Sequence, residues 1–342
     1  MKFNASQIAM MLQGQLVGDD VMVDSLSKIE EGKSGSLSFL SNPKYVPYIY
    51  QTAASVVIVN EEFQPEKPLP DTLTLIKVKD AYAAFAQLLE AYNQFLLPPP
   101  GISAHSSIAS DVKLGENVHI GDWVSIGPGA VIGDHVIIQS GSTIGARVII
   151  KDRTVLYPGV RVYHDCHIGS HCTLHANVVI GSDGFGFAPN AENQYNKVPQ
   201  IGNVILEDRV DVGAGTCIDR ATMGSTIIRK GVKLDNLIQI AHNVEVGENT
   251  VMAALCGVAG STKIGKNCMI GGQVGFAGHI SIADGTKIAA QSGIASSIKE
   301  PNTTIQGSPA MSIMDYNKSY VIFRKLPALQ QMVNAISKKL ES

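Results

Sequence analysis

A few residues in the second half of the sequence have the types and spacing that acyl transfer requires. Gly260 stands eighteen positions after His242, which lies in IQIAHNVEV, and His279 stands one position beyond a second such step. A histidine can take a proton as a general base, and an unshielded glycine amide can donate to a developing oxyanion. Asp235, seven positions before His242, would orient the imidazole from another face or another subunit. The alternative is a solvated histidine without a chemical role.

The element that must position these residues is set by a six-residue period. An aliphatic residue occupies every sixth position over 102–180 and again over 206–218, and a third register over 228–294 also admits Met and Phe. Neither a helix nor a flat strand explains this period, whereas a triangular prism does. Three faces form a coil of about 18 residues, and coils stack about 4.8 Å apart through parallel backbone hydrogen bonds. The sequence therefore predicts a mainly β chain, a parallel solenoid of roughly ten coils, with His242 and Gly260 on one corner.

Other phases of the hexad indicate what fills the solenoid and what forms its corners. The position four residues after each aliphatic residue is small or β-branched, and four of the five cysteines, at 166, 172, 256 and 268, occupy it. We expect these thiols to be buried fillers rather than nucleophiles. The absence of a CxxC argues against a zinc ribbon and a disulfide framework. Glycine often follows the aliphatic residue, where we expect it to relieve steric conflict at a corner.

Two interruptions break the register. The aliphatic positions Ile180 and Leu206 are twenty-six positions apart, and Ile218 and Ile228 are ten apart. Insertions in solenoids emerge as loops and often build the binding site. The first insertion carries two aromatic residues, Phe185 and Phe187, which favour contact with a ligand or a neighbouring subunit. The second is equally well explained as an idle surface loop.

The segments that flank the solenoid define the domain organisation. Residues 1–97 lack the hexad and predict a small α/β domain, with helices near 5–14 and 80–95 and strands near 36–41 and 55–60. PPPG at 98–101 predicts a stiff linker, and residues 102–300 form the solenoid, ended by GSPA at 307–310. Residues 301–342 predict a C-terminal extension with a helix. One face of that helix carries an apolar stripe of Leu326, Leu329, Val333, Ile336 and Leu340.

Composition and charge exclude several functional classes. Hydrophobic residues make up 45% and charged residues 17%, with a net charge of −3, which argues against broad binding of nucleic acid or anionic membrane. No basic leader and no transmembrane segment are apparent, so we expect a cytoplasmic protein. Four histidines, at 164, 167, 171 and 175, cluster in the sequence but fall in different phases of the hexad. We therefore expect exposed histidines rather than a metal site.

Four segments together carry a resemblance to a known family. They are DNLIQIAHNVEVG (235–247), GSDGFGFAP (181–189), QIGNV (200–204) and FLSNPKY (39–45). With the hexad array they resemble the UDP-3-O-acylglucosamine N-acyltransferases of lipid A synthesis, over nearly the whole chain. The resemblance implies a left-handed parallel β-helix and a homotrimer with active sites between subunits. It also implies transfer of a 3-hydroxyacyl group from acyl carrier protein to the 2-amine of UDP-3-O-acylglucosamine.

The resemblance assigns roles to His242 and the residues around it. His242 would remove a proton from the glucosamine amine, and Gly260 would supply the oxyanion N–H to the thioester carbonyl. Asp235 would orient His242, and His279 would help to bind substrate or pantetheine. No metal or other cofactor is implied, because a thioester is already activated and the acyl group arrives on the phosphopantetheine of the carrier. The run AAQSG at 289–293 has small side chains, so we hypothesise a groove that admits a long acyl chain.

In the N-terminal domain the resemblance implies a uridine-nucleotide site. Phe39 and Tyr45 would be aromatic plates around uracil, and Asn42 would hydrogen-bond its edge; the alternative for the aromatics is core packing. At the other end of the chain, Lys318, Arg324 and Lys325 would meet an acidic carrier protein, or would only form a solvated helix face.

Three rival functions remain at this point. The UDP-N-acetylglucosamine O-acyltransferase of the same pathway shares the solenoid and the carrier protein but lacks an N-terminal domain with a uracil motif. A solenoid carbonic anhydrase needs three convergent zinc histidines, which the spacings here do not supply. A non-enzymatic binding scaffold predicts that His242→Ala changes no activity.

Overall fold

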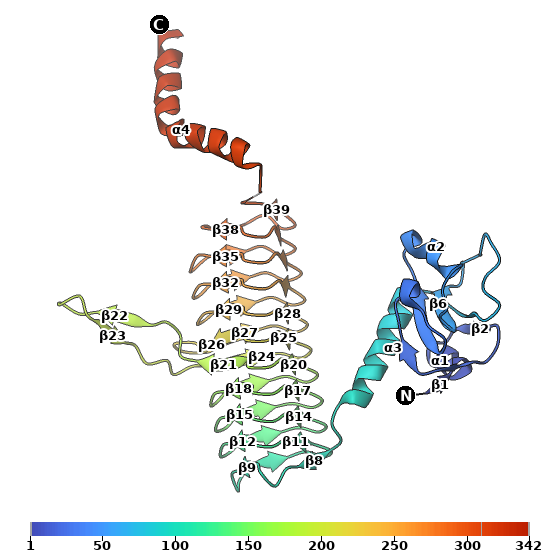
Figure 1. The fold of residues 1–342 in the computed structure, drawn as a ribbon. Helices are drawn as coiled ribbons and strands as arrows, with labels where there is room; N and C mark the ends of the chain where they lie inside the picture. Colours follow the sequence, from blue (N-terminus) through green and yellow to red (C-terminus); the bar gives the residue numbers. More distant parts are fainter. Residues whose placement is uncertain (1, 309, 341–342) are drawn as a thin grey trace. The chain divides into compact units, whose positions relative to one another are not determined.

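The computed structural model describes residues 2–308 and 310–340 of the chain (Figure 1). It divides into two compact units, residues 1–98 and residues 99–342. The first unit contains a five-stranded sheet and its helices, and the second contains the hexad array and the C-terminal helix.

The N-terminal unit is an α/β layer structure. Its sheet has the order β2-β7-β6-β5-β4, with β2 antiparallel to β7 and the other pairs parallel. Separate apolar clusters cover its two faces, and one of them includes residues of two helices. Both predicted helices and both predicted strands are present, and three further strands complete the sheet. The elements are α1 (Ala5–Met11), α2 (Val46–Ile49), α3 (Ala81–Leu96), β2 (Gln15–Val17), β4 (Ser25–Leu26), β5 (Ser36–Leu40), β6 (Val56–Asn60) and β7 (Thr74–Val78), with a small ladder of β1 (Phe3–Asn4) and β3 (Met22–Val23).

The hexad array forms a three-sided parallel solenoid. Its faces are parallel sheets of nine, ten and eleven short strands. The nine-stranded face runs from β10 (Lys113–Leu114) to β36 (Ser281–Ile282), and the eleven-stranded face from β8 (Gly101–Ile102) to β39 (Thr304–Ile305). We call the ten-stranded face the site sheet. It consists of β9 (Ser107–Ile108), β12 (Ser125–Ile126), β15 (Thr143–Ile144), β18 (Arg161–Val162), β21 (Val179–Ser182), β26 (Cys217–Asp219), β29 (Gln239–Ile240), β32 (Gly257–Val258), β35 (Gly275–Phe276) and β38 (Gly293–Ile294).

The solenoid interior is filled as the hexad predicts. The aliphatic residue that ends each strand points inward, and from Ile120 to Ile294 these residues are buried in one continuous cluster. The four cysteines at the small position are also buried, with at most 2% exposure. Burial raises the pKa of the Cys172 thiol to about 11, so it stays protonated and unreactive at neutral pH. The prediction of buried fillers is confirmed.

Two features of the turns allow the coils to stack closely. The third residue after most of the inward aliphatic residues takes a left-handed backbone conformation, usually without being glycine; Asn243 (φ 61°) and His279 (φ 60°) are examples. The glycine directly after the aliphatic has a different role. A methyl group at Gly145, for instance, would lie 2.5 Å from the backbone nitrogen of His164 in the next coil. Glycine is required there because two coil backbones approach each other.

The solenoid ends later than the sequence suggests. Strand β39 (Thr304–Ile305) pairs with β37 (Lys287–Ile288) and places Ile305 opposite Ile288. The predicted end at residue 300 is therefore wrong. These paired residues are one position closer in the sequence than in a usual coil. The aliphatic residue of β39 therefore does not fall on the six-residue period. Of the predicted terminator 307–310, residue 309 lies outside the described residues.

Parallel pairing continues past both interruptions, with one β-bulge between Ile180 and Ser182 where the longer insertion begins. Strand β24 (Asn203–Leu206) pairs with β19 (His167–Ile168), so the coil between them is more than twice the usual length. The next coil reaches β27 (Ser225–Ile228) with four extra residues. The longer insertion forms a hairpin of β22 (Phe187–Pro189) and β23 (Tyr195–Lys197), which leaves the stack beside β21 and β24 (Figure 1).

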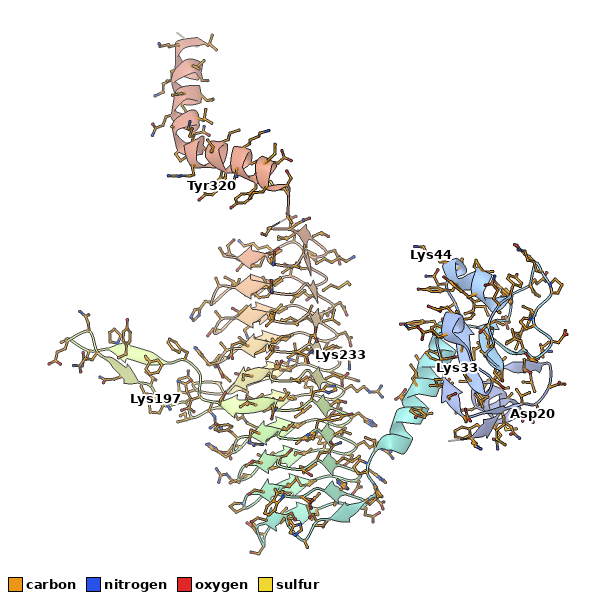
Figure 2. The ribbon with its side chains drawn as sticks, in the orientation of Figure 1. Asp20, Lys33, Lys44, Lys197, Lys233 and Tyr320 are labelled. Atoms are coloured by element: carbon orange, nitrogen blue, oxygen red, sulfur yellow. The ribbon has the colours of Figure 1, made fainter. Side chains whose placement is uncertain are left out.

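A single helix, α4 (Ile313–Leu340), follows the solenoid, and none of its described residues is buried. It carries the predicted apolar stripe and contains Pro327. Figure 2 shows the side chains along this helix, with Tyr320 labelled. None of the described helices is long and apolar enough to span a membrane.

Candidate active site

His242 lies in the turn after β29 and is held between two glycines. A methyl group at Gly260, one coil above, would lie 2.6 Å from Nε2 of His242 and 2.7 Å from Cε1. A methyl group at Gly184, in the longer insertion, would lie 2.8 Å from Cβ and 3.1 Å from Cδ2. The imidazole therefore contacts bare backbone on both sides, and Nε2 faces Gly260. The hexad pattern indicated Gly260 but not Gly184.

The backbone of Gly260 is fixed by the coils on either side, while its amide stays free. The Ser261 N–H donates to the carbonyl oxygen of His242 (2.9 Å), and the His279 N–H donates to the carbonyl oxygen of Gly260 (3.0 Å). The Gly260 N–H has no hydrogen-bond partner among the described residues. The predicted stack of His242, Gly260 and His279 is thus present, with a bare amide beside the imidazole.

A comparison with other turns explains why this amide is free. At some of the equivalent turns, the residue of the next coil caps this amide: Asp284, for example, accepts from the Lys266 N–H at 2.9 Å. The residue that would cap Gly260 is Gly278, which has no side chain. Two stacked glycines therefore leave an N–H available to a ligand.

The other ring nitrogen of His242 is occupied. Nδ1 lies 3.2 Å from Oδ1 of Asn243, the next residue in the turn. Sequence reasoning missed this contact, because it depends on how a neighbouring coil holds Asn243.

A buried carboxylate, Asp219, lies one coil below the turn that carries His242. It is only 8% exposed and accepts hydrogen bonds from Ser182 Oγ and Gln239 Nε2, both at 2.8 Å. Burial raises the pKa of Asp219, whereas the hydrogen bond from Ser182 and the charge of the His242 imidazole act in the opposite direction. Asp219, which the sequence pattern did not indicate, is therefore close enough to His242 to interact with it electrostatically within one chain.

Asp235 lies on a different edge of the solenoid from His242. It follows β28 (Lys233–Leu234) on the eleven-stranded face, and its carboxylate accepts from the backbone N–H groups of Asn236 (2.8 Å) and Ala254 (3.1 Å). The structure does not bring Asp235 to His242 within one chain. Its predicted orienting role requires a second subunit.

An open groove runs along the site sheet beside His242. It has a volume of about 600 Å³ and is lined mainly by small residues of four successive coils. Its floor contains Gly257, Gly275 and Gly293. Of the predicted run at 289–293, only Gly293 lines this groove, because the other residues occupy the turn that precedes β38.

The predicted uracil residues lie at the end of β5 in the N-terminal unit. Phe39 is half-buried and stacks on Phe85 of α3, with ring centroids 4.1 Å apart. Asn42 is exposed and its Oδ1 accepts from the Lys44 N–H at 3.0 Å, which starts a short 3-10 helix at Pro43–Tyr45. Tyr45 is 43% exposed. Core packing therefore explains one face of Phe39 but not Tyr45.

The longer insertion holds a second group of aromatic side chains. Phe185 and Phe187 meet edge to face, with centroids 4.9 Å apart, and with Tyr195 they line a hollow of about 410 Å³. Phe185 is 86% exposed. Their predicted contact with a ligand or another subunit stays a prediction.

No group of three His, Cys, Asp or Glu in the described part of the chain is placed to hold a metal ion. Of the four clustered histidines, His164 bonds instead to Asp165 and Arg220, and His175 stacks on Tyr157 with centroids 4.9 Å apart.

An imidazole nitrogen beside an unpartnered amide, in adjacent coils of a hexad solenoid, is an arrangement that suits acyl transfer and is consistent with a hexapeptide-repeat acyltransferase. The bacterial transferase hexapeptide model matches residues 102–146, 147–182 and 261–296. The model for UDP-3-O-(3-hydroxymyristoyl) glucosamine N-acyltransferase matches residues 20–91. The expected parallel β-helix of hexapeptide repeats, with an N-terminal α/β unit and a C-terminal helix, is confirmed.

The chain belongs to the UDP-3-O-acylglucosamine N-acyltransferase family. It is 56% identical to the protein of that name from Christiangramia forsetii, over the whole of both chains. It is also 56% identical to the Bacteroides thetaiotaomicron protein, covering 100% of this chain and 98% of the relative. The Paraburkholderia phytofirmans protein is 40% identical, covering 98% and 94%. The predictions of family and of an N-acyltransferase are confirmed.

Solved structures with a similar solenoid include the UDP-N-acetylglucosamine acyltransferase from Campylobacter jejuni. It is 21% identical, with a TM-score of 0.44, and covers 61% of this chain and 72% of its own.

Proposed function

We propose that the chain transfers a 3-hydroxyacyl group from acyl carrier protein to the 2-amine of UDP-3-O-acylglucosamine, giving UDP-2,3-diacylglucosamine for lipid A. The observation that carries this proposal is the juxtaposition of His242 Nε2 with Gly260, whose amide is unpartnered among the described residues. Full-length relatives that share the family name support the choice of substrate.

His242 and Gly260 divide the chemistry between them. The amine attacks the thioester carbonyl carbon while Nε2 of His242 takes the amine proton. The Gly260 N–H donates to the oxygen of the tetrahedral intermediate. When the C–S bond breaks, the imidazolium returns its proton to the pantetheine thiolate. The acyl group, one proton and the electron pairs are thus accounted for without a metal or redox cofactor.

His279 and Asp235 complete the proposed site at its borders. His279 is exposed one coil above Gly260, where a substrate or pantetheine group entering the turn would meet it. Asp235 reaches an imidazole only across a subunit boundary, since within one chain it lies on a different edge. This placement supports active sites that two copies of the chain share.

The groove on the site sheet is the proposed binding surface for the incoming acyl chain. A methyl group at Gly257, Gly275 or Gly293 would meet nothing within 4 Å, and none of the three has a left-handed backbone. Nothing inside the chain therefore calls for glycine, although glycine in a strand costs about 0.5–1 kcal/mol. An external group that lies close to the strands explains all three. The open floor up to Gly293 supports a long acyl chain.

The N-terminal unit is the proposed uridine-nucleotide domain. Tyr45 offers an exposed ring, and the amide nitrogen of Asn42 has no partner among the described residues. That nitrogen can donate to a uracil carbonyl. Phe39 would contribute the ring face that does not stack on Phe85.

A homotrimer and a docked carrier protein, both in the cytoplasm, complete the proposal. The stripe on α4 has no cover within the described chain and fits helix–helix contact between copies. Five basic residues against one acidic residue in α4 suit an acidic carrier protein, with Lys318, Arg324 and Lys325 as the expected contacts.

The test is an acyl-transfer assay with UDP-3-O-acylglucosamine and 3-hydroxyacyl-acyl carrier protein. We expect His242→Ala to lower kcat by roughly 10²- to 10⁴-fold, with an unchanged oligomer in analytical ultracentrifugation. His167→Ala, at an exposed strand position in another coil, is the control and should retain full activity. An active His242→Ala enzyme, or an inactive wild type, would refute the proposal.

A further inference from the structure

The side chain of Asn243 has three polar neighbours that determine its orientation. Its Oδ1 lies 3.1 Å from the Thr222 backbone nitrogen and 3.2 Å from His242 Nδ1. Its Nδ2 lies 2.9 Å from the carbonyl oxygen of Met223. The backbone of Asn243 is also fixed, since its N–H donates to Thr226 Oγ1 at 2.9 Å.

Backbone chemistry permits only one orientation of this amide. The Thr222 N–H can only donate, so the atom that faces it must be the amide oxygen. The Met223 carbonyl can only accept, so the atom that faces it must be the amide nitrogen. A flipped amide would place two donors together and two acceptors together. The fold therefore directs Oδ1, an acceptor, at the ring of His242.

The orientation of Asn243 determines which nitrogen of His242 carries the proton. Because Oδ1 can only accept, Nδ1 must be the protonated nitrogen of the neutral ring, and Nε2 is left bare beside Gly260. We propose that Asn243 is a positioning residue that selects the Nδ1–H tautomer of His242 and so presents Nε2 as the base. This inference rests on the proposed function of the site.

A second histidine in the same solenoid has the same arrangement at its Nδ1. His164 occupies the same turn position as His242, and the next residue, Asp165, also has a left-handed backbone (φ 64°). Asp165 Oδ2 lies 2.7 Å from His164 Nδ1, and Arg220 donates to His164 Nε2 at 3.0 Å. Since arginine only donates, His164 must carry its proton on Nδ1. The turn geometry thus lets the following side chain choose the tautomer.

The shorter insertion supplies the groups that hold Asn243. Thr222 and Met223 both belong to the segment between β26 and β27 that contains the four extra residues. Thr222 Oγ1 also donates to Gln200 Oε1 at 2.7 Å, which ties this segment to the longer insertion. The idle-loop interpretation of the shorter insertion is therefore replaced by a supporting role.

Nitrogen-15 NMR of histidine-labelled protein tests the tautomer without substrate. In the wild type, above the titration range of the ring, we expect Nδ1 of His242 to be protonated and Nε2 to be bare. The signal is assigned by its loss in His242→Gln. Asn243→Ala should move the proton toward Nε2, whereas Asn243→Asp, which keeps an acceptor, should retain the Nδ1–H form. A wild-type ring protonated on Nε2 would overturn the inference.

Kinetics provide a second readout. We expect Asn243→Ala to lower kcat by about tenfold or more while KM changes little, because only the base is affected. Asn243→Asp keeps the acceptor at Nδ1 but loses the donor to the Met223 carbonyl, so it should recover part of the loss. The matched control is Asn267→Ala, at the same turn position on another edge with φ 56°, which introduces the same backbone cost and should leave kcat unchanged. Full activity of Asn243→Ala would overturn the inference, whereas an inactive wild type with the expected tautomer would refute only the proposed function.

Discussion

Two histidines at equivalent turns of the site sheet have opposite environments. Both rings carry an acceptor oxygen at Nδ1, from Asp165 for His164 and from Asn243 for His242. They differ at Nε2: Arg220, which is 1% exposed, donates to that of His164, whereas that of His242 faces bare Gly260. The His164 imidazole thus accepts a hydrogen bond from a buried guanidinium, whereas Nε2 of His242 is free to accept a proton from a ligand.

The comparison shows that the hexad position alone does not make a base. The environment of the imidazole depends on which side chains the neighbouring coils place next to the ring. An arginine two coils away makes the imidazole at this position part of the structure, whereas two glycines leave the imidazole open to a ligand.

Gly260→Ala tests the requirement for an empty contact above His242. The new methyl group would lie 2.6 Å from Nε2 of His242, so the imidazole must move and Nε2 is displaced from its position beside residue 260. We expect kcat to fall by roughly 10²- to 10⁴-fold, measured by acyl transfer. Gly101→Ala, whose methyl group has open space, is the control. An active Gly260→Ala enzyme would show that Nε2 does not act from this position.

Gly278→Asp tests the requirement for an uncapped amide. The carboxylate would accept from the Gly260 N–H, as Asp284 does from Lys266, and the oxyanion would lose its donor. We expect kcat to fall by about 10²- to 10³-fold at an unchanged or higher Tm. Gly278→Ala adds a side chain without an acceptor and should lose far less. Equal losses in the two variants would point to crowding instead of capping.

His164→Ala should affect stability rather than chemistry. It leaves Nη1 of the buried Arg220 without its acceptor, and hydrogen bonds to charged groups contribute about 1.5–3 kcal/mol. We expect a lower free energy of unfolding in urea and an unchanged kcat at a temperature where the variant is folded. A large drop in kcat with unchanged stability would contradict the assignment of a structural role to His164.

Asp165→Asn makes the His164–Asp165 pair resemble the His242–Asn243 pair. It should have the smallest effect of these variants, and the effect is on stability. The Arg147 guanidinium, and then the His164 imidazole, hold the pKa of Asp165 far below its usual range. The ionised carboxylate therefore stabilises the fold above its unfolded pKa of about 3.9, and this stabilisation is lost as pH falls below that value. The contribution is small because Asp165 and Arg147 are 41% and 63% exposed. We expect Tm to fall less between pH 5 and pH 2 in the variant than in the wild type; equal falls would contradict the assignment.

The solenoid could be predicted in detail because its signal is local and repeated. Each inward residue repeats every six positions, so three such steps place Ile240 opposite Val258 and His242 next to Gly260. The prediction failed where the step changed. Strand β39 lies one position closer to its partner than a full coil would place it, and the hexad count therefore ended too early.

The surroundings of His242 could not be predicted for the same reason. Thr222 and Asp219 reach the site through a coil that contains four extra residues, so a regular coil step does not align them with the histidine. The position of Gly184 depends on how the longer insertion folds back. The stacking of Phe39 on Phe85 depends on where α3 packs against its sheet, which the local pattern does not specify.

The parallel strand pairing on either side of each insertion has an evolutionary consequence. Strands β19 and β24 pair in register although the hairpin separates them in the sequence (Figure 1). Figure 2 shows the hairpin, with Lys197 labelled, projecting from the stack. Doubling the length of such a loop costs only about 0.6 kcal/mol. Selection can therefore exchange or extend these loops, and so diversify what the enzyme accepts, while the scaffold beneath them is inherited almost unaltered.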